Sequence, residues 1–129
     1  MQVAVIRLGS NDLKRSRSFY DATLVTLGAE PSTSAADASF IVYELPGGPK
    51  IMLAHPRNGE AANGGNGSTI MFEVDSAASV QAWHAAGLEN GGTNEGDPVV
   101  RPQAGNAMGA FLRDPDGNKL GMFHGLIPA

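Results

Sequence analysis

Apolar and polar positions divide the chain into short segments that follow the same order twice. In the first half, a run rich in β-branched residues (2–8) predicts a strand, and apolar residues at helical spacing (13–27) follow it. The runs at 40–45 and 50–55 predict two more strands joined by a Pro-Gly-Gly turn, and 29–34 is a weaker strand candidate. This order predicts a strand–helix–three-strand unit.

The second half repeats this order. A strand is predicted at 69–74, and Asp75 or Ser76 can cap the helix that follows it. A weak strand comes next, and the runs at 107–113 and 118–124 predict two final strands around a well-specified turn. The chain therefore reads as two βαβββ modules.

Matching positions in the two halves support a duplicated unit. Tyr20 and Trp83 lie 63 positions apart, and so do Gly28 and Gly91 at the ends of the two helices. A length of 129 residues suits a single domain, 1–129, built from both modules. The predicted parts are module 1 at about 1–57, a Gly/Asn-rich linker at 58–67 and module 2 at about 68–126.

Composition excludes several classes of partner and site. The chain has no cysteine, which excludes disulfides and thiolate metal sites. Its net charge of −4 gives no general affinity for nucleic acid or an anionic membrane, and Lys14, Arg15 and Arg17 are expected to form a solvated helix face. The N-terminal segment lacks the long apolar run of a signal peptide or membrane span, so we expect a cytoplasmic protein.

Four segments, in order and at consistent spacing, carry a resemblance over almost the whole chain. They are D-L-K-R-S-R-S-F-Y-D-A-T-L-V-T-L-G (12–28), I-M-F-E-V-D-S (70–76), R-P (101–102) and A-F-L-R-D-P-D-G-N-K-L (110–120). With them the chain resembles the vicinal oxygen chelate superfamily, which includes glyoxalase I, bleomycin-resistance proteins and extradiol dioxygenases. The resemblance implies an α+β fold in which both modules form one cupped eight-stranded mixed sheet, with helices outside and a cavity inside. It also implies a homodimer.

Enzymes of this superfamily hold a divalent metal in the cavity, and the resemblance places the ligand positions at Val5, Met52, Thr69 and Gly121. None of these residues carries an imidazole or carboxylate, the donors that such metals need. We therefore expect no metal and no cofactor. Gly121 lies where strands tolerate glycine least, so it either marks the missing ligand or allows a β-bulge or a close backbone approach.

Strand alternation indicates which other side chains share the cavity side. If Val5 and Thr69 point inward, then Arg7, Met71 and Glu73 do so too, and their apolar neighbours face the helices. Arg7 and Glu73 would then either orient a polar ligand or pair with each other at the rim of the sheet. The expected ligand-binding residues are Val5, Arg7, Met52, Thr69, Met71, Met108 and Gly121, with Arg101 at the mouth.

The histidines offer no clear catalytic group. His55 and His124 end strands, His84 is expected to be partly exposed on the second helix, and a site that joins all three would require them to converge from different faces. His55 could act as a general base, but the sequence supplies no partner for it. No catalytic residue is assigned.

Three functions remain open at this point. The first is a metal-free protein that binds a small molecule in the cavity. The second is an enzyme: a lyase or isomerase that uses side chains alone, or a dioxygenase-type enzyme with non-standard metal ligands. The third is a structural or regulatory dimer with a filled cavity.

Overall fold

Within residues 1–128, seven strands and two α-helices follow the expected order except that the first half has one strand fewer than predicted. The structure is a computed structural model that describes residues 1–128. Module 1 contains β1 (Val5–Gly9), α1 (Leu13–Leu24), the short 3-10 helix η1 (Val25–Leu27), β2 (Phe40–Glu44) and β3 (Lys50–Ala54). Module 2 contains β4 (Ile70–Glu73), α2 (Ala77–Glu89), β5 (Thr93–Arg101), η2 (Pro102–Ala104), β6 (Ala107–Arg113) and β7 (Lys119–His124).

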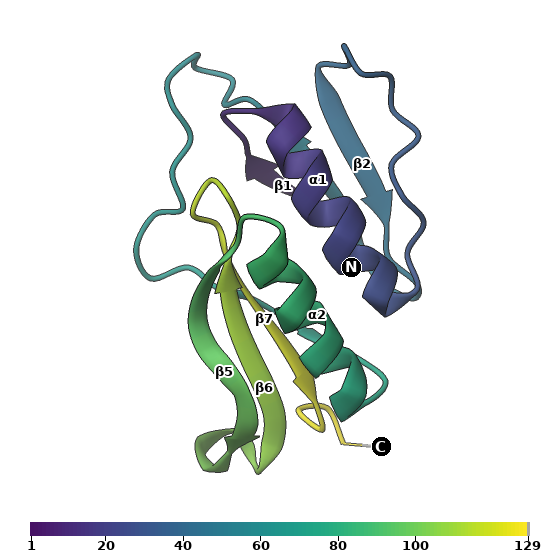
Figure 1. Ribbon diagram of the computed structural model, residues 1–129, viewed down its shortest axis with the longest axis vertical. Helices are drawn as coiled ribbons and strands as arrows, with labels where there is room; N and C mark the ends of the chain where they lie inside the picture. Colours follow the sequence, from purple (N-terminus) through teal and green to yellow (C-terminus); the bar gives the residue numbers. More distant parts are fainter. Residues whose placement is uncertain (129) are drawn as a thin grey trace.

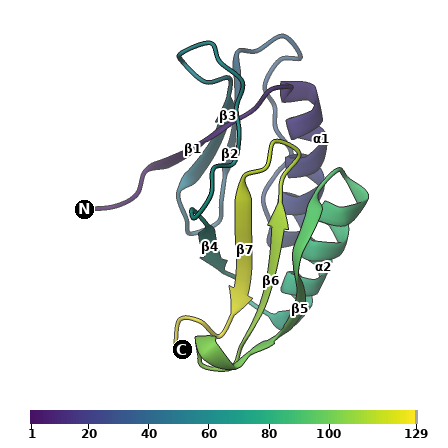
Figure 2. The same cartoon turned by 90° about the vertical axis from the view of Figure 1, so that its left-hand side faces the viewer.

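The strands form two sheets. Module 1 has the order β1-β3-β2 and module 2 has the order β4-β7-β6-β5. The pairs β1–β3 and β4–β7 are parallel, and the other pairs are antiparallel. Both helices lie on one side of the sheets (Figure 1), and the opposite sides carry no helix (Figure 2). We call these uncovered sides the open faces.

The expected eight-stranded cupped sheet is wrong for the described chain, because the segment 29–34 forms no strand. Pro31 has no backbone N–H for a ladder. The backbone N–H of Ser32 donates to Asp21 (3.0 Å), and that of Ser34 donates to the Ser32 hydroxyl (3.2 Å). These local bonds to side chains replace strand pairing.

A side chain caps the start of each α-helix, at Ser76 as predicted and at Asp12. Asp12 accepts a hydrogen bond from the backbone N–H of Arg15, and Ser76 accepts one from that of Ser79. Gly28 ends the first helical segment with a φ of 88°, a conformation that favours glycine. None of the helices within residues 1–128 is long and apolar enough to cross a membrane.

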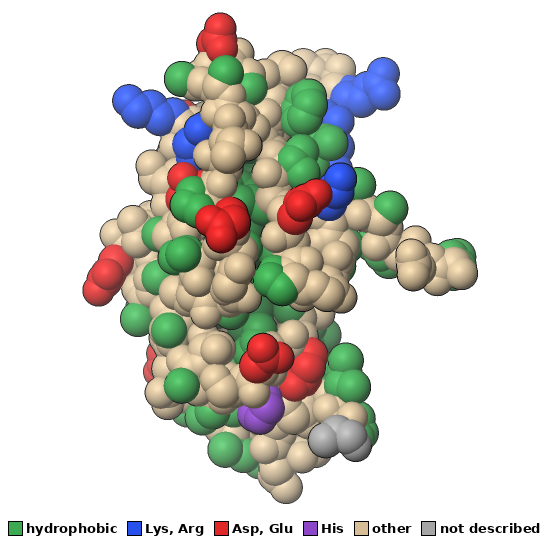
Figure 3. Space-filling model, turned by 90° about the vertical axis from the view of Figure 1, so that its right-hand side faces the viewer, with side chains coloured by type: hydrophobic (Ala, Val, Ile, Leu, Met, Phe, Trp, Pro, Cys, Tyr) green, Lys and Arg blue, Asp and Glu red, His purple; other side chains and the backbone are tan. Residues whose placement is uncertain are grey.

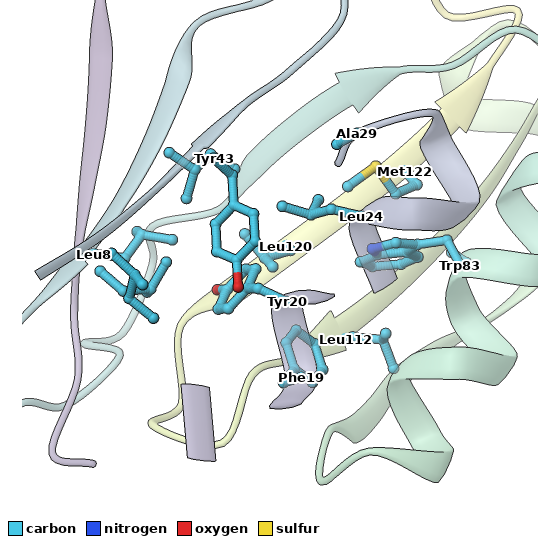
Figure 4. Close-up of a cluster of buried hydrophobic side chains, with 14 of the residues drawn as sticks. Leu8, Phe19, Tyr20, Leu24, Ala29, Tyr43, Trp83, Leu112, Leu120 and Met122 are labelled. Atoms are coloured by element: carbon cyan, nitrogen blue, oxygen red, sulfur yellow. The ribbon is translucent and has the colours of Figure 1, made fainter. Parts of the chain in front are cut away.

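The core fills the space between the helices and the sheets of both modules (Figure 4). Tyr20 from α1 and Trp83 from α2 are fully buried, together with Leu112, Leu120 and Met122 from β6 and β7. The predicted alternation is confirmed, since the apolar residues of β1 and β4 next to the cavity-side positions pack against this core. One shared core therefore joins the two modules.

Hydrogen bonds from α1 to the β6–β7 turn connect the two modules. Asp114 accepts hydrogen bonds from the Tyr20 hydroxyl (2.6 Å) and the Asn118 amide (2.8 Å). Asp116 is buried and accepts from Arg15 (2.7 Å) and from the Ser16 hydroxyl (3.2 Å). Burial raises the pKa of Asp114, although the bonds from Tyr20 and Asn118 oppose this shift. The Asp-Pro-Asp-Gly-Asn turn thus has a structural role between the modules.

Candidate functional site

Three predicted ligand-binding residues lie together on the open face of the three-stranded sheet. Val5 and Arg7 are exposed on β1, and Met52 is the direct partner of Arg7 on β3. Their neighbours Ile6 and Leu8 point to the other side and pack in the core. The strand register therefore places Val5, Arg7 and Met52 as expected.

A second group lies on the open face of the four-stranded sheet. Met71 on β4 is the direct partner of Gly121 on β7, and its side chain is 53% exposed. Thr69 lies two residues before Met71, just ahead of β4. The predicted residues thus divide between two sheets.

An aromatic ring covers Gly121. A Cβ atom at this position would lie 2.9 Å from Cε1 of Phe111, the residue directly opposite on β6, and 3.1 Å from Cγ of Met71. Gly109 repeats the arrangement, because a Cβ there would overlap the ring of Phe123. The two rings meet edge to face with centroids 5.4 Å apart. Gly121 is therefore explained by a close approach, and Phe111 is a site residue that the sequence analysis missed.

Two cationic side chains lie against the same ring. The guanidinium carbon of Arg101 is 5.5 Å from the Phe111 centroid, and Nζ of Lys119 is 5.3 Å from it. Arg101 is held in place, since Nε donates to the Gly109 carbonyl (3.2 Å) and Nη2 donates to the Asp97 carbonyl (2.6 Å). The predicted mouth residue Arg101 is therefore part of a cation–aromatic cluster, defined here as Arg101, Phe111 and Lys119.

Arg7 and Glu73 do not pair with each other at the rim of the sheet, which was one of their two expected roles. Arg7 donates from Nη2 to the His55 carbonyl (2.9 Å). Glu73 instead accepts three backbone N–H groups from the C-terminal segment 125–127, at 2.8–2.9 Å. Partial burial acts to raise the pKa of Glu73, but these donors and nearby His124 outweigh it and lower the pKa below its usual value.

Met108 does not lie on an open face. It is the partner of His124 in the β6–β7 ladder, on the same side as buried Met122, and it packs against the core. His84 is buried, not partly exposed as expected, and its Nε2 lies 2.9 Å from Oδ1 of Asn94. The ring of His55 donates from Nδ1 to the Ser10 carbonyl (2.8 Å). His124 lies against the Val74 carbonyl (2.9 Å), so each of the three histidines has a different hydrogen-bond partner.

A groove of about 600 Å³ lies where the modules meet, between the end of α1, the β2–β3 turn and β4. On this side of the molecule, carboxylates gather around the middle and hydrophobic side chains are visible between them (Figure 3). Among the predicted ligand-binding residues, Met71 alone lines this groove, together with Glu73 and Ile127. The predicted lining residues therefore do not surround one cavity within a single copy of the chain.

The residues at the inherited metal positions do not fit a divalent metal. Within residues 1–128, no group of three His, Cys, Asp or Glu side chains could hold an ion. Val5, Met52 and Gly121 supply no oxygen or nitrogen side-chain donor, and the ring of Phe111 occupies the space above Gly121.

The strand–helix–strand order, the two sheets and the site positions define a paired-module fold of the glyoxalase type. The family model described as the Glyoxalase/Bleomycin resistance protein/Dioxygenase superfamily matches residues 2–122, so the chain belongs to this superfamily. A search among curated proteins found no match.

Solved structures share the fold at several levels of identity. A glyoxalase/bleomycin resistance protein from Albidiferax ferrireducens is 42% identical, with a TM-score of 0.83, and the match covers 94% of this chain and 96% of that one. A glyoxalase-related enzyme from Fulvimarina pelagi is 22% identical (TM-score 0.75; 96% and 88% covered). The lactoylglutathione lyase of Agrobacterium tumefaciens is 19% identical (TM-score 0.65; 96% and 93% covered) and shows a similar fold.

Proposed function

We propose that this chain is a metal-free small-molecule binding protein of the glyoxalase/bleomycin-resistance type. Its ligand contacts the open faces of the two sheets. The observation that carries the proposal is the state of the Gly121 position, where superfamily enzymes place a metal-binding carboxylate. Here the position has no side chain, and Phe111 and Met71 lie so close that an added Cβ would crowd both.

A second copy of the chain completes the cavity in this proposal. Apolar side chains remain uncovered on both open faces: Val5 is 43% exposed and Met71 is 53% exposed. β1 and β4 each pair with one strand only, so both strands have a free edge in the single chain. A homodimer that covers these faces and edges would bring the two groups of predicted residues together.

The test of the metal-free proposal is elemental analysis of protein purified without chelators. We expect substoichiometric zinc, nickel, iron and manganese. Near-stoichiometric amounts of any of these metals, lost when Thr69 is replaced by Ala but retained in the solvent-exposed control Thr33→Ala, would contradict the proposal and favour a lyase, isomerase or dioxygenase with non-standard ligands.

The dimer is tested by light scattering coupled to size-exclusion chromatography. We expect twice the mass of the 13.3 kDa chain, and a shift to the single-chain mass when Met71 is replaced by Lys. Lys at the exposed outer position Leu88 on α2 is the control and should leave the mass unchanged. A monomer at all concentrations would contradict the shared cavity.

A further inference from the structure

The charges on the open faces point to a small planar anion, such as an aromatic carboxylate, as the class of ligand. This inference rests on the proposed function and adds the chemistry of the ligand to it. It assigns recognition of the anion to Arg101 and Lys119 beside Phe111, with Arg7 as a third cation from the other sheet.

The first step is the uneven distribution of charge over the molecule, which its net charge does not show. The chain as a whole has a net charge of −4. Within residues 1–128, however, Arg7, Arg101 and Lys119 on the open faces make no ion pair with a carboxylate. The other two open-face cations, Lys50 and Arg113, are paired with Glu44 and Glu95 respectively.

The second step concerns Glu73, the carboxylate that strand alternation places on the open side next to Met71. Glu73 belongs to the open side of β4, but its carboxylate already accepts three backbone N–H groups from 125–127. These bonds occupy its oxygens and Glu73 stays ionised, so it offsets one positive charge without pairing with Arg7, Arg101 or Lys119. The open faces retain an excess of positive charge.

Closure of the faces makes this excess costly. If a second copy covers them, as proposed, three cations that have no carboxylate partner within their own chain lose water, and an unpaired charge removed from water is strongly unfavourable. A bound anion supplies the missing partner. A cationic ligand would increase the repulsion, which argues against a positively charged drug as the natural ligand.

The third step is the shape of the surface. Gly121 and Gly109 let the rings of Phe111 and Phe123 lie close to the sheet, so the cations flank an aromatic surface. Arg101 is fixed through Nε and Nη2, and within residues 1–128 its Nη1 donates no hydrogen bond. A planar ligand can stack or meet these rings edge to face while its carboxylate accepts from Arg101 and Lys119.

Three probes of nearly the same shape test the charge directly: benzoate, benzamide and benzamidine are anionic, neutral and cationic. Protein labelled with carbon-13 at the methionine methyls is titrated with each probe and followed by NMR. Met52 and Met71 report on the open faces, and Met122, fully buried on the helix side, is the internal control. We expect benzoate to shift Met71 at concentrations about tenfold lower than benzamide, and benzamidine to have the weakest effect.

The variant Lys119→Gln should weaken benzoate binding about tenfold and leave benzamide binding unchanged. Lys14→Gln removes the same charge from the exposed side of α1 and is the matched control, with no expected change. Unfolding curves of both variants check that the fold is retained.

The outcomes separate this inference from the proposed function. If benzamide or benzamidine shifts Met71 as strongly as benzoate, or if Lys119→Gln and Lys14→Gln behave alike, the anionic class is wrong and small-molecule binding stands. If no probe shifts Met52 or Met71 at any concentration tested, both the ligand class and binding at the open faces are contradicted.

Discussion

The helix side and the open side of the sheets differ sharply in how far their apolar side chains are buried. On the helix side, Leu112, Leu120 and Met122 are at most 1% exposed and pack between the helices and the sheet. On the open side, Val5 on β1 and Met71 on β4 are about half exposed, although they are also apolar. Sequence hydrophobicity alone does not distinguish the two sides.

The difference shows which side holds the fold and which side is available for binding. Leu112, Leu120 and Met122 on the helix side are fully buried within one copy of the chain. The open side combines uncovered apolar groups, which often mark binding surfaces, with cations that have no carboxylate partner within the described residues and can attract an anion. Substitutions on the two sides should therefore have different effects.

The largest difference is expected for truncations of similar size on the two sides. Leu120→Ala leaves a cavity in the helix-side core and should lower the free energy of unfolding by about 3 kcal/mol. Met71→Ala removes an exposed side chain and should change it by about 0.5 kcal/mol or less. Urea unfolding at a concentration where the chain is monomeric measures both, and equal losses would contradict the comparison.

A smaller effect is expected where the open side is itself tightly packed. Gly121→Ala places a methyl 2.9 Å from Phe111 and should cost about 1 kcal/mol of unfolding free energy. In a Phe111→Ala background the same substitution should cost nothing or stabilise. Gly48→Ala, whose added Cβ would meet Leu45 at an ordinary 3.4 Å, is the control. A cost that is the same in both backgrounds would rule out the ring as its cause.

Loss of the Glu73 carboxylate should act locally. The folded state lowers the pKa of Glu73, so the ionised carboxylate stabilises the fold at pH values above the ordinary pKa of 4.5. This stabilisation is lost as the pH falls below that value. Glu73→Gln should therefore raise amide exchange at 125–127 about tenfold at neutral pH, with Glu89→Gln on α2 as the control. If the amides of 125–127 stay protected from exchange in the variant and in acid, a contact other than the Glu73 carboxylate protects them.

The smallest effect is expected for the exposed ion pair on the open side. Lys50 and Glu44 are 3.5 Å apart and both are largely exposed. Lys50→Gln should lower the unfolding free energy by at most about 0.5 kcal/mol, and less in high salt. A loss that equals that of Leu120→Ala would mean that the open side also supports the fold of the single chain.

Most of the fold could be predicted because local signals agree with the tertiary structure. Alternation in β1 and β4 correctly predicted which side chains face the helices, and Ser76 caps the second helix as expected. The segment 29–34 was misassigned because its apolar character is weak, and bonds from its backbone to side chains such as Asp21 compete with strand pairing.

The site was only partly predictable. Met108 was assigned by resemblance, whereas the hairpin register pairs it with His124 on the helix side. The same register pairs Phe111 with Gly121, so the ring above the glycine could have been found by counting outward from the β6–β7 turn. The positions of Arg101 and Lys119 against this ring depend on side-chain torsions, which no sequence pattern specifies.

The contacts between the β6–β7 turn and α1 also bear on synthesis by the ribosome. Arg15 and Tyr20 bond to Asp116 and Asp114, which follow them by 101 and 94 positions. At roughly 5–20 residues per second, the acceptors are translated about 5–20 s after the donors. During this interval the first helix has neither its carboxylate partners nor most of its core, so a nascent chain that stalls before the turn would expose the apolar side of α1 to chaperones and proteases.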